Sequence, residues 1–423
     1  MRLSAVLFLA GATLIDPHTH TVEIAGLLVK DGKVVSHVAL GSEATVPKEA
    51  IQIDLKGKFV MPGLVDLHVH SWGNDSILEN GKDDDPGHAA VLARMLYCGV
   101  VAALDLGSDP DEIFPLRDKQ RANPESVPGA FLFAAGPVLG AWVLKSPDEA
   151  RHIIHRLAKR KPDVVKLMYD HVGRDAKKGM NRAIFSAAAG EAKKLGLKTV
   201  VHIGSWDDAA NAVEGGASAI THLFDSEEIP EKLARRMKEL GVVEIPTMAV
   251  QGDLYRVTKN PAMLEDPLLK NVTPSWFLSE FAKPQKQWKS RARRFFEWQK
   301  ADIPTDYISI KRLYGAGVEL LAGSDAANFA TFQGYSAHRE IQILNEAGLS
   351  AWDALAAGTT RAAAFLGHHY GVAPGDEAEL VILGANPVEA VGRTEKVEGV
   401  LHLGRYWGPS EREKLKGLMR LEQ

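Results

Sequence analysis

From about residue 60 onward, short runs of β-branched and apolar residues alternate with longer amphipathic segments. Each run has the length of a strand, and the segments between them carry apolar residues at the spacing that a helix requires. Eight runs can be recognised, at 64–69, 100–106, 130–135, 164–169, 198–203, 219–223, 242–248 and 319–324. This alternation predicts repeated βα units around a parallel sheet.

The connections between the runs are short and end in glycine. Residues 182–195 have apolar side chains at helical spacing and stop before Gly196, a residue suited to a helix C-cap. Residues 207–214 form a short predicted helix that is closed by Gly215 and Gly216. Eight parallel strands with helices between them is the count of a TIM-type (β/α)8 barrel, whose active site lies at the C-terminal ends of the strands.

Both ends of the chain differ from its middle. Residues 1–57 and the stretch from 371 to about 407 contain short strand-like segments separated by Gly, Pro and Asn turns. We therefore expect an α/β protein in two parts. A small β-sandwich domain is built from residues 1–57 and 371–423, and the (β/α)8 barrel at 58–370 is inserted between them.

Composition narrows the classes of partner. The 423 residues are 45% hydrophobic and 25% charged, with a net charge of -4, which gives no general attraction for nucleic acid or an anionic membrane. Cys98 is the single cysteine, which excludes an intramolecular disulfide and suits a reducing compartment. Residues 1–12 imitate a signal peptide, but the apolar run continues through 13–17, so we expect a buried strand and a cytoplasmic protein.

One long segment, residues 250–300, mixes aromatic and basic side chains. Stacking on nucleic acid is one interpretation, but an amphipathic helix with its aromatics against the barrel explains the pattern more simply. Such a segment would form a lid wall, and its cationic rim would suit a substrate carboxylate. The aromatic residues are Trp276, Phe277, Phe281, Trp288, Phe295, Phe296 and Trp298, and the basic ones are Lys283, Lys286, Lys289, Arg291, Arg293 and Arg294.

The candidate chemistry begins at the first strand of the barrel. His68 and His70 are two residues apart, so they project from one face of the strand with backbones about 7 Å apart. Such a pair alone is more often a buried, hydrogen-bonded pair than a metal site. Side chains able to bind a metal recur, however, at the ends of later strands: Lys166, His202, His222 and Asp325. A lysine within an apolar strand needs a reason, and the simplest alternative for Lys166 is a salt bridge to a barrel carboxylate.

With these residues in place, the chain resembles the amidohydrolase superfamily, specifically members similar to prolidases, arginine carboxypeptidases and imidazolonepropionase-related proteins. The resemblance covers nearly the whole chain, and its motifs are specific in combination. They lie at 58–70, 99–100 leading to 105–107, 216–222, 322–325, 338–341, 347–350 and 373–383.

The resemblance implies a metal centre with a modified lysine. Carbon dioxide would convert Lys166 into a carbamate that bridges two divalent ions, since an ammonium cannot bind a cation. His68, His70 and Asp325 would hold one ion, and His202 and His222 the other. These ligand types favour zinc and also accept manganese, cobalt or iron. A hydroxide between the ions would attack the substrate, and Asp325 would shuttle its proton to the leaving group.

Three further residues are weaker candidates for substrate binding. Tyr169 and His171 follow Lys166 on the fourth loop, where related peptidases often carry small residues. Tyr169 would donate a hydrogen bond to a carbonyl or carboxylate. His338, after the eighth strand, would touch substrate or support the ligands, or else lie exposed at a helix start.

These features predict a hydrolase that cleaves an amide (carbon–nitrogen) bond in a small molecule, a dipeptide or an N-acyl amino acid, and that forms a homo-oligomer as related proteins do. An ester, lactone or organophosphate hydrolase would use the same hydroxide. A deaminase with one metal would need a glutamate soon after His202, which is followed instead by Ile203-Gly204-Ser205-Trp206. A non-catalytic scaffold is a further alternative, because fold alone does not give function.

Overall fold

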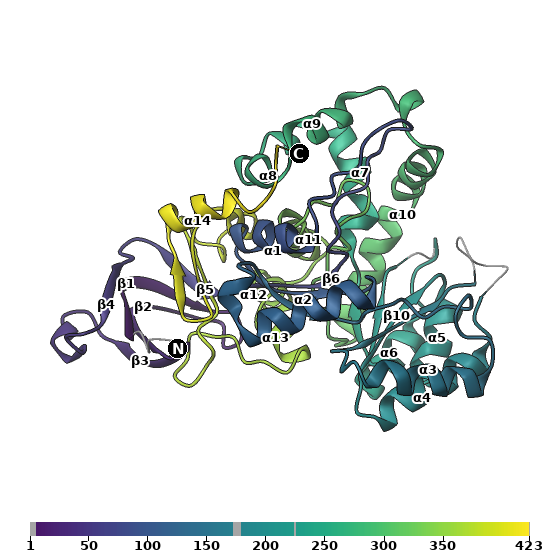
Figure 1. Cartoon of the computed structure of the whole chain (residues 1–423), viewed down its shortest axis with the longest axis horizontal. Coiled ribbons are helices and arrows are strands. Elements are labelled where there is room, and N and C mark those ends of the chain that lie inside the picture. The colour runs from purple at the N-terminus through teal and green to yellow at the C-terminus, as the bar shows by residue number, and fades with distance from the viewer. Residues whose placement is uncertain (1–5, 172–178, 224–225, 423) are drawn as a thin grey trace.

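The computed structural model describes residues 6–171, 179–223 and 226–422. Segments from both ends of the chain form one sheet, in which purple N-terminal and yellow C-terminal strands lie side by side (Figure 1). Its strand order is β15-β14-β13-β5-β1-β2-β3, and β4 pairs with β1. The strands are β1 (Val6–Asp16), β2 (Thr21–Lys30), β3 (Lys33–Val38), β4 (Ile51–Asp54), β5 (Phe59–Pro62), β13 (Leu380–Leu383), β14 (Val397–His402) and β15 (Arg405–Trp407).

The predicted β-sandwich is not confirmed, because the described terminal strands join edge to edge in this single sheet. The joint is β5, which runs parallel to β1 and antiparallel to β13. One face of the sheet buries a separate apolar cluster that includes Leu9, Leu27, Val60 and Leu380. A strand's own alternation of apolar and polar residues does not reveal which neighbour it pairs with, so one sheet and two stacked sheets look alike in sequence.

The middle of the chain is of the TIM type, with parallel strands and helices around them. Seven of the eight predicted runs form strands, in two separate sheets ordered β6-β7-β8 and β12-β11-β10-β9. Their bounds are β6 (Leu64–Val69), β7 (Val100–Asp105), β8 (Phe131–Ala134), β9 (Val165–Tyr169), β10 (Thr199–Ile203), β11 (Ala219–Thr221) and β12 (Val243–Ile245).

The sequence led us to expect one closed barrel of eight strands. The described residues do not form one continuous ladder of that kind. The eighth run and the residues just after it meet β12 and β6 through isolated bridges, Glu244 with Leu320 and Val69 with Ala326, and through separate backbone hydrogen bonds, such as that from the Leu67 amide to the Ala322 carbonyl. Pairing does not continue beyond the run, since Asp325 and Ala327 have φ angles of 54° and 139°, which no extended strand can adopt.

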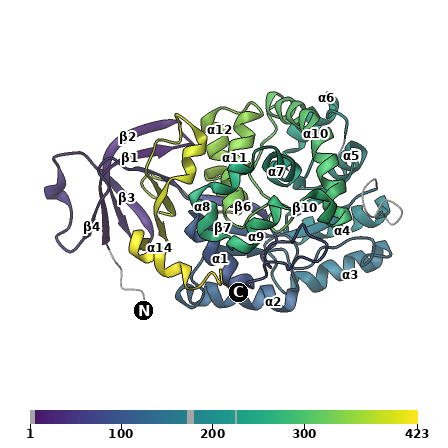
Figure 2. The same ribbon diagram turned by 90° about the horizontal axis from the view of Figure 1, so that it is seen from above.

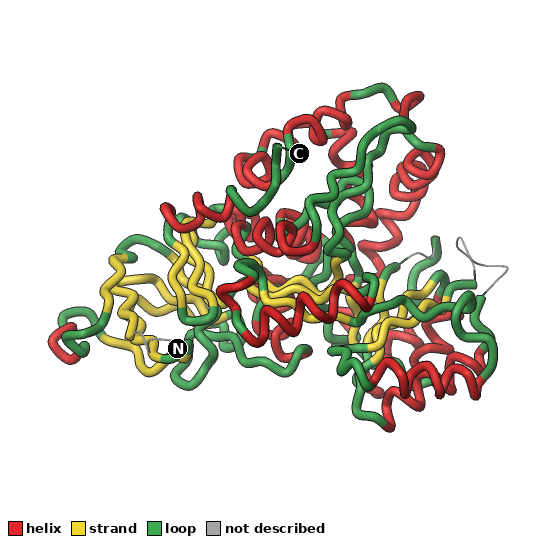
Figure 3. Tube along the Cα trace, viewed as in Figure 1, coloured by secondary structure: helices red, strands yellow, loops and turns green. Residues whose placement is uncertain are grey.

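Helices surround these sheets, and those of the 248–315 region gather on one side of the molecule (Figures 1 and 3). Seen from above, the terminal sheet lies at one end, and α5, α6 and α10 lie toward the other (Figure 2). The helices are α1 (His88–Tyr97), α2 (Pro110–Ala122), α3 (Pro147–Ala158), α4 (Arg182–Lys194), α5 (Trp206–Glu214), α6 (Glu231–Leu240), α7 (Met248–Lys259), α8 (Pro267–Val272), α9 (Ser275–Leu278), α10 (Ser290–Gly315), α11 (Tyr335–Glu346), α12 (Ala351–Ala357), α13 (Thr360–Phe365) and α14 (Pro409–Lys416). Among the described residues, no helix has both the length and the apolar character needed to cross a bilayer.

The aromatic and basic segment contains α7 to α10 rather than a single helix. Phe277 and Trp288 are buried, and Trp298 is exposed, so most of the aromatic surface packs inward as expected for an amphipathic segment. The segment also holds the loop that follows β6, because the amide of Lys289 donates to the carbonyl of Ile77 at 2.7 Å. This contact ties the segment to the loop at the carboxyl end of β6.

Candidate metal centre

The first two predicted ligands stand at the end of β6, a strand that is buried along its whole length. The His68 side chain is 1% exposed, and its Nδ1 shares a hydrogen bond of 2.8 Å with the Thr221 hydroxyl. The His70 ring stacks on Trp72 with 4.6 Å between ring centroids. The two imidazole rings face each other edge to face, 5.5 Å apart.

Asp325 approaches both histidines from the segment after the eighth run. Its Oδ1 lies 3.3 Å from His68 Nε2 and 3.2 Å from His70 Nε2. Its own backbone amide donates to the carbonyl of His68 at 2.7 Å, which fixes the two segments against each other. The left-handed conformation of Asp325 is therefore held by the strand that carries the histidines.

A buried carboxylate that the sequence analysis missed supports this pair of segments. Asp66 accepts hydrogen bonds from the Ser324 amide at 2.9 Å, the Ser324 hydroxyl at 2.6 Å and the His68 amide at 3.2 Å. Burial raises the pKa of Asp66 to about 6, although these hydrogen bonds oppose the rise. Asp66 precedes His68 by two residues, so the same period-two rule that selected the histidines would have found it.

Lys166 reaches the cluster from β9. Its side chain is 2% exposed, and Nζ lies 3.4 Å from His68 Nε2. Burial lowers the pKa of this amine to about 7, while the charge of Asp325 opposes the fall. Within the described ranges no carboxylate lies at ion-pair distance from Lys166, so the salt-bridge explanation has no partner there.

His202 and His222 complete the group at the ends of β10 and β11. Their ring centroids are 4.4 Å apart, and those of His222 and His68 are 5.0 Å apart. Burial lowers the pKa of His202 to about 3 and that of His222 well below its ordinary value, so both rings stay neutral. Ligand atoms of His68, His222 and Asp325 all lie within 4.8 Å of one another.

The donor set fits a divalent metal. A threonine hydroxyl is hydrogen-bonded to Nδ1 of each of two histidines, Thr221 to His68 and Thr247 to His222, the latter at 2.8 Å. Nε2 of His68 therefore faces the Asp325 carboxylate. Neutral imidazoles and a carboxylate are the ligands that zinc prefers, and a fixed partner at the second ring nitrogen is typical of metal-binding histidines.

The structure does not bring the three weaker candidates into this group. Tyr169 packs against Phe185 of α4, with 4.6 Å between ring centroids, and therefore faces the helical layer. His171 Nδ1 is 2.5 Å from an Asp208 carboxylate oxygen. His338 is wholly buried in α11, and its Nε2 lies 2.8 Å from the carbonyl oxygen of Cys98.

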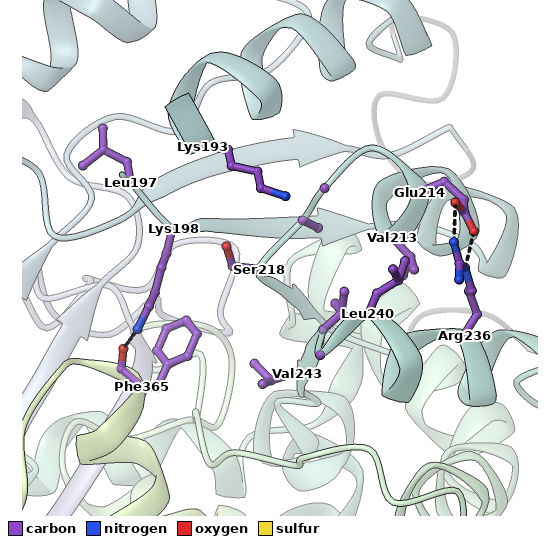
Figure 4. A pocket seen from close by; sticks show the side chains of 14 residues that line it. Lys193, Leu197, Lys198, Val213, Glu214, Ser218, Arg236, Leu240, Val243 and Phe365 are labelled. Carbon is purple, nitrogen blue, oxygen red and sulfur yellow. Dashed lines mark hydrogen bonds and ion pairs between the residues drawn. The ribbon is translucent and has the colours of Figure 1, made fainter. Parts of the chain in front are cut away.

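A pocket of about 490 Å³ lies at the opposite end of the strands (Figure 4). It is lined by residues that precede β10 and β11, such as Lys198 and Ser218, whereas His202 and His222 lie at the other ends of those strands. Three of its charged groups have partners, since Arg236 pairs with Glu214 and Lys198 donates to the carbonyl of Phe365. In TIM-type folds this end serves stability rather than chemistry.

Known proteins agree with this architecture. In solved structures, the fold resembles a Xaa-Pro dipeptidase with bound methionine, with a TM-score of 0.78, 17% identity, and coverage of 96% of this chain and 100% of that one. It also resembles a putative prolidase from Bifidobacterium longum, with a TM-score of 0.74, 20% identity, and coverage of 97% and 98%. At these identities the likeness concerns the fold.

Sequence relatives match over shorter stretches. A dihydroorotase of Anaeromyxobacter sp. (strain K) is 35% identical over 68 residues, which are 16% of this chain and 15% of the relative. A deacetylase of Agrobacterium fabrum is 48% identical over 46 residues, 11% of each chain. The chain thus spans only a small part of these relatives' length.

The amidohydrolase family model, in contrast, matches residues 59–405. Because that match covers most of the chain and both sheets of the central part, the protein belongs to the amidohydrolase family.

Proposed function

We propose that this protein is a metal-dependent hydrolase that cleaves the amide bond of a dipeptide or an N-acyl amino acid, using two divalent ions. The observation that carries the proposal is Lys166, an amine buried among imidazoles with Nζ 3.4 Å from His68 Nε2. A protonated amine would repel a metal there. Because its pKa is about 7, a large share of the amine is neutral near neutral pH and can add carbon dioxide with loss of a proton, which yields an anionic carbamate.

The residues divide into two ligand groups. His68, His70 and Asp325 would hold one ion, His202 and His222 the other, and the carbamate of Lys166 would join them, with zinc as the favoured metal. Bound divalent ions would supply an acidified water molecule and polarise the scissile carbonyl. A mononuclear deaminase leaves Lys166 without a role.

Asp325 is the proposed proton carrier. Its carboxylate faces the Nε2 atoms of His68 and His70, and its backbone is anchored to β6. A group so fixed would take the proton of the attacking water and deliver it to the departing amine, as general acid–base catalysis requires. The wholly buried Asp66 would keep Asp325 in place through Ser324.

The rim offers a group for a substrate carboxylate. Arg291 of α10 has a side chain 51% exposed, and its guanidinium lies 3.4 Å from the Asn328 side-chain oxygen. The Asn328 amide in turn donates to the carbonyl of Asp325 at 3.1 Å. Arg291 is thus linked through Asn328 to the backbone of the proposed proton carrier, and it also lies 3.7 Å from the Asp75 carboxylate, with which a substrate would share it. Its fork of N–H donors matches a carboxylate.

A panel of dipeptides, N-acyl amino acids, esters and lactones tests the proposal, with metal content measured on the same sample. We expect amide hydrolysis with about two metal ions per chain. About one ion per chain with release of ammonia would instead identify a deaminase. Turnover of esters or lactones alone would show that the amide assignment is wrong.

A further inference from the structure

The start of α7 lacks its usual cap. Thr247 stands at the N-cap position, where a threonine hydroxyl ordinarily accepts a hydrogen bond from an amide of the first turn. Here the side chain makes no such bond. Its hydroxyl lies instead 2.8 Å from Nδ1 of His222. The residue that should cap the helix therefore supports an imidazole of the metal centre.

A carboxylate from another helix takes over the cap. Glu340 lies on α11, is wholly buried, and accepts a hydrogen bond of 2.7 Å from the amide of Ala249 in the first turn of α7. Within the described part of the chain, its other oxygen, Oε1, has no hydrogen-bond partner. Burying a carboxyl group with one bonded oxygen is unfavourable and raises the pKa of Glu340 to about 8, so a hydrophobic side chain would serve packing better at this position.

The backbone between the two groups is strained. Thr247 has φ 53° and ψ 46°, the left-handed region that β-branched residues rarely adopt. Such a conformation persists only where the surroundings hold it, and it is common at functional sites. Two contacts hold Thr247 in this conformation. Glu340 accepts a hydrogen bond from the start of α7, and His222 is hydrogen-bonded to the Thr247 hydroxyl.

We propose that Glu340 is a positioning residue for His222. By capping α7 from α11, it holds Thr247 in the left-handed conformation and leaves the threonine hydroxyl to the imidazole. The hydroxyl in turn fixes the ring so that Nε2 faces the cluster. The inference rests on the proposed function in taking His222 as a metal ligand.

The test compares Glu340→Ala with Glu340→Gln, which keeps an oxygen acceptor for the Ala249 amide. Zinc affinity is measured by competition with a chelator, and the His222 tautomer by NMR of metal-free protein labelled with 15N-histidine. We expect Glu340→Ala to bind zinc roughly 10–100-fold more weakly, the usual effect of losing a supporting partner, and to lose the spectrum of a ring hydrogen-bonded at Nδ1. Glu340→Gln should stay within a few-fold of the parent.

Two further variants separate positioning from general loosening. Leu344→Ala removes a wholly buried side chain from the same helix and should leave zinc affinity unchanged. Thr247→Val removes only the hydroxyl and should weaken zinc binding as Glu340→Ala does. Because both changes act through one contact, the double variant should be no weaker than Thr247→Val alone. If Glu340→Ala does not fold, Glu340→Asp, which shortens the side chain, should weaken binding in the same direction.

Parent-like zinc affinity and an unchanged His222 spectrum in the folded Glu340 variants would overturn the inference. An equal loss in Leu344→Ala would overturn it as well, because the effect would then be one of packing. If the parent protein binds no zinc, the proposed function fails, while the metal-free NMR comparison still decides the role of Glu340.

Discussion

Gly323 provides a sharp test of how tightly the metal centre is built. A Cβ atom at this position would lie 2.6 Å from Cγ2 of Ile245 and 2.9 Å from both Cβ and the backbone nitrogen of His68. Carbon atoms in contact prefer about 3.5–4.0 Å, so the segment must move away from β6 and β12 by roughly an ångström. Overpacking of this kind in a closed core destabilises by about 1–3 kcal/mol, and here it displaces a proposed ligand.

Gly190→Ala is the matched control for Gly323→Ala. Gly190 lies inside α4, and no atom outside its own helix turn lies within 4 Å of an added Cβ. Replacing glycine by alanine in a helix interior stabilises by roughly 0.5–1 kcal/mol. The same chemical change should therefore have opposite signs at the two positions. Urea unfolding of metal-free protein measures both, with an unchanged m-value as the check that only stability has changed.

Zinc affinity should separate the two variants further. We expect Gly323→Ala to bind zinc more weakly, because His68 is pushed aside, and Gly190→Ala to bind it like the parent. The reasoning would be refuted if Gly323→Ala unfolded at the parent urea concentration and bound zinc with the parent affinity. That result would mean that the contacts with His68 and Ile245 relax at no measurable free-energy cost.

Three other predictions concern the site. Lys166→Ala should lose activity and metal content, with partial rescue by short carboxylic acids, and an unaffected variant would exclude the carbamate. The buried imidazoles, such as His202 with its pKa of about 3, stay neutral when folded, whereas unfolded histidines titrate near 6.5. The unfolded state thus binds more protons below about pH 6.5. Each such histidine should therefore lower the free energy of unfolding of metal-free protein as the pH falls, by up to about 1.4 kcal/mol per pH unit well below pH 6.5. Denaturation of the parent and of His202→Ala at pH 7 and 5.5 measures this, because buried acids with a raised pKa, such as Glu340 and Asp66, act in the opposite direction in both proteins. The parent should lose more stability than the variant on acidification, and an equal loss in the two would contradict the reasoning. Arg291→Gln should raise KM about tenfold for substrates with a free carboxylate but not for their amides, whereas Arg294→Gln, exposed on the same helix, should change neither.

The group of candidate metal ligands could be predicted from the sequence because two general rules apply to its residues. Residues two apart on a strand share a face, and parallel strands end together, so His68 and Lys166 were expected near each other although they lie far apart in the chain. The structure puts their side chains 3.4 Å apart. Residues that bind the substrate were harder to predict. Tyr169 also lies at the end of a strand, but its ring packs against Phe185 on the helical side.

The supporting residues could not be predicted in the same way. Thr247 and Glu340 act through a helix cap made between two helices, and neither carries a periodic signal of that role. The eighth run looks like a strand by composition, but the left-handed backbone at Asp325 ends the ladder there. Such a conformation depends on contacts with another segment, here the carbonyl of His68, and not on the local residues alone.

The pairing of β5 with β13 has a consequence for how the protein is made. Met61 pairs with Val381, about 320 residues later, and β5 leads through Gly63 directly into the strand of His68. At the usual rate of synthesis, β5 emerges from the ribosome roughly 15–60 s before its partner strand. During that interval the edge of β5 is open to incorrect pairing, and loop closure over such a distance is slow. The first ligand strand therefore reaches its final anchorage only after nearly all of the protein has been translated.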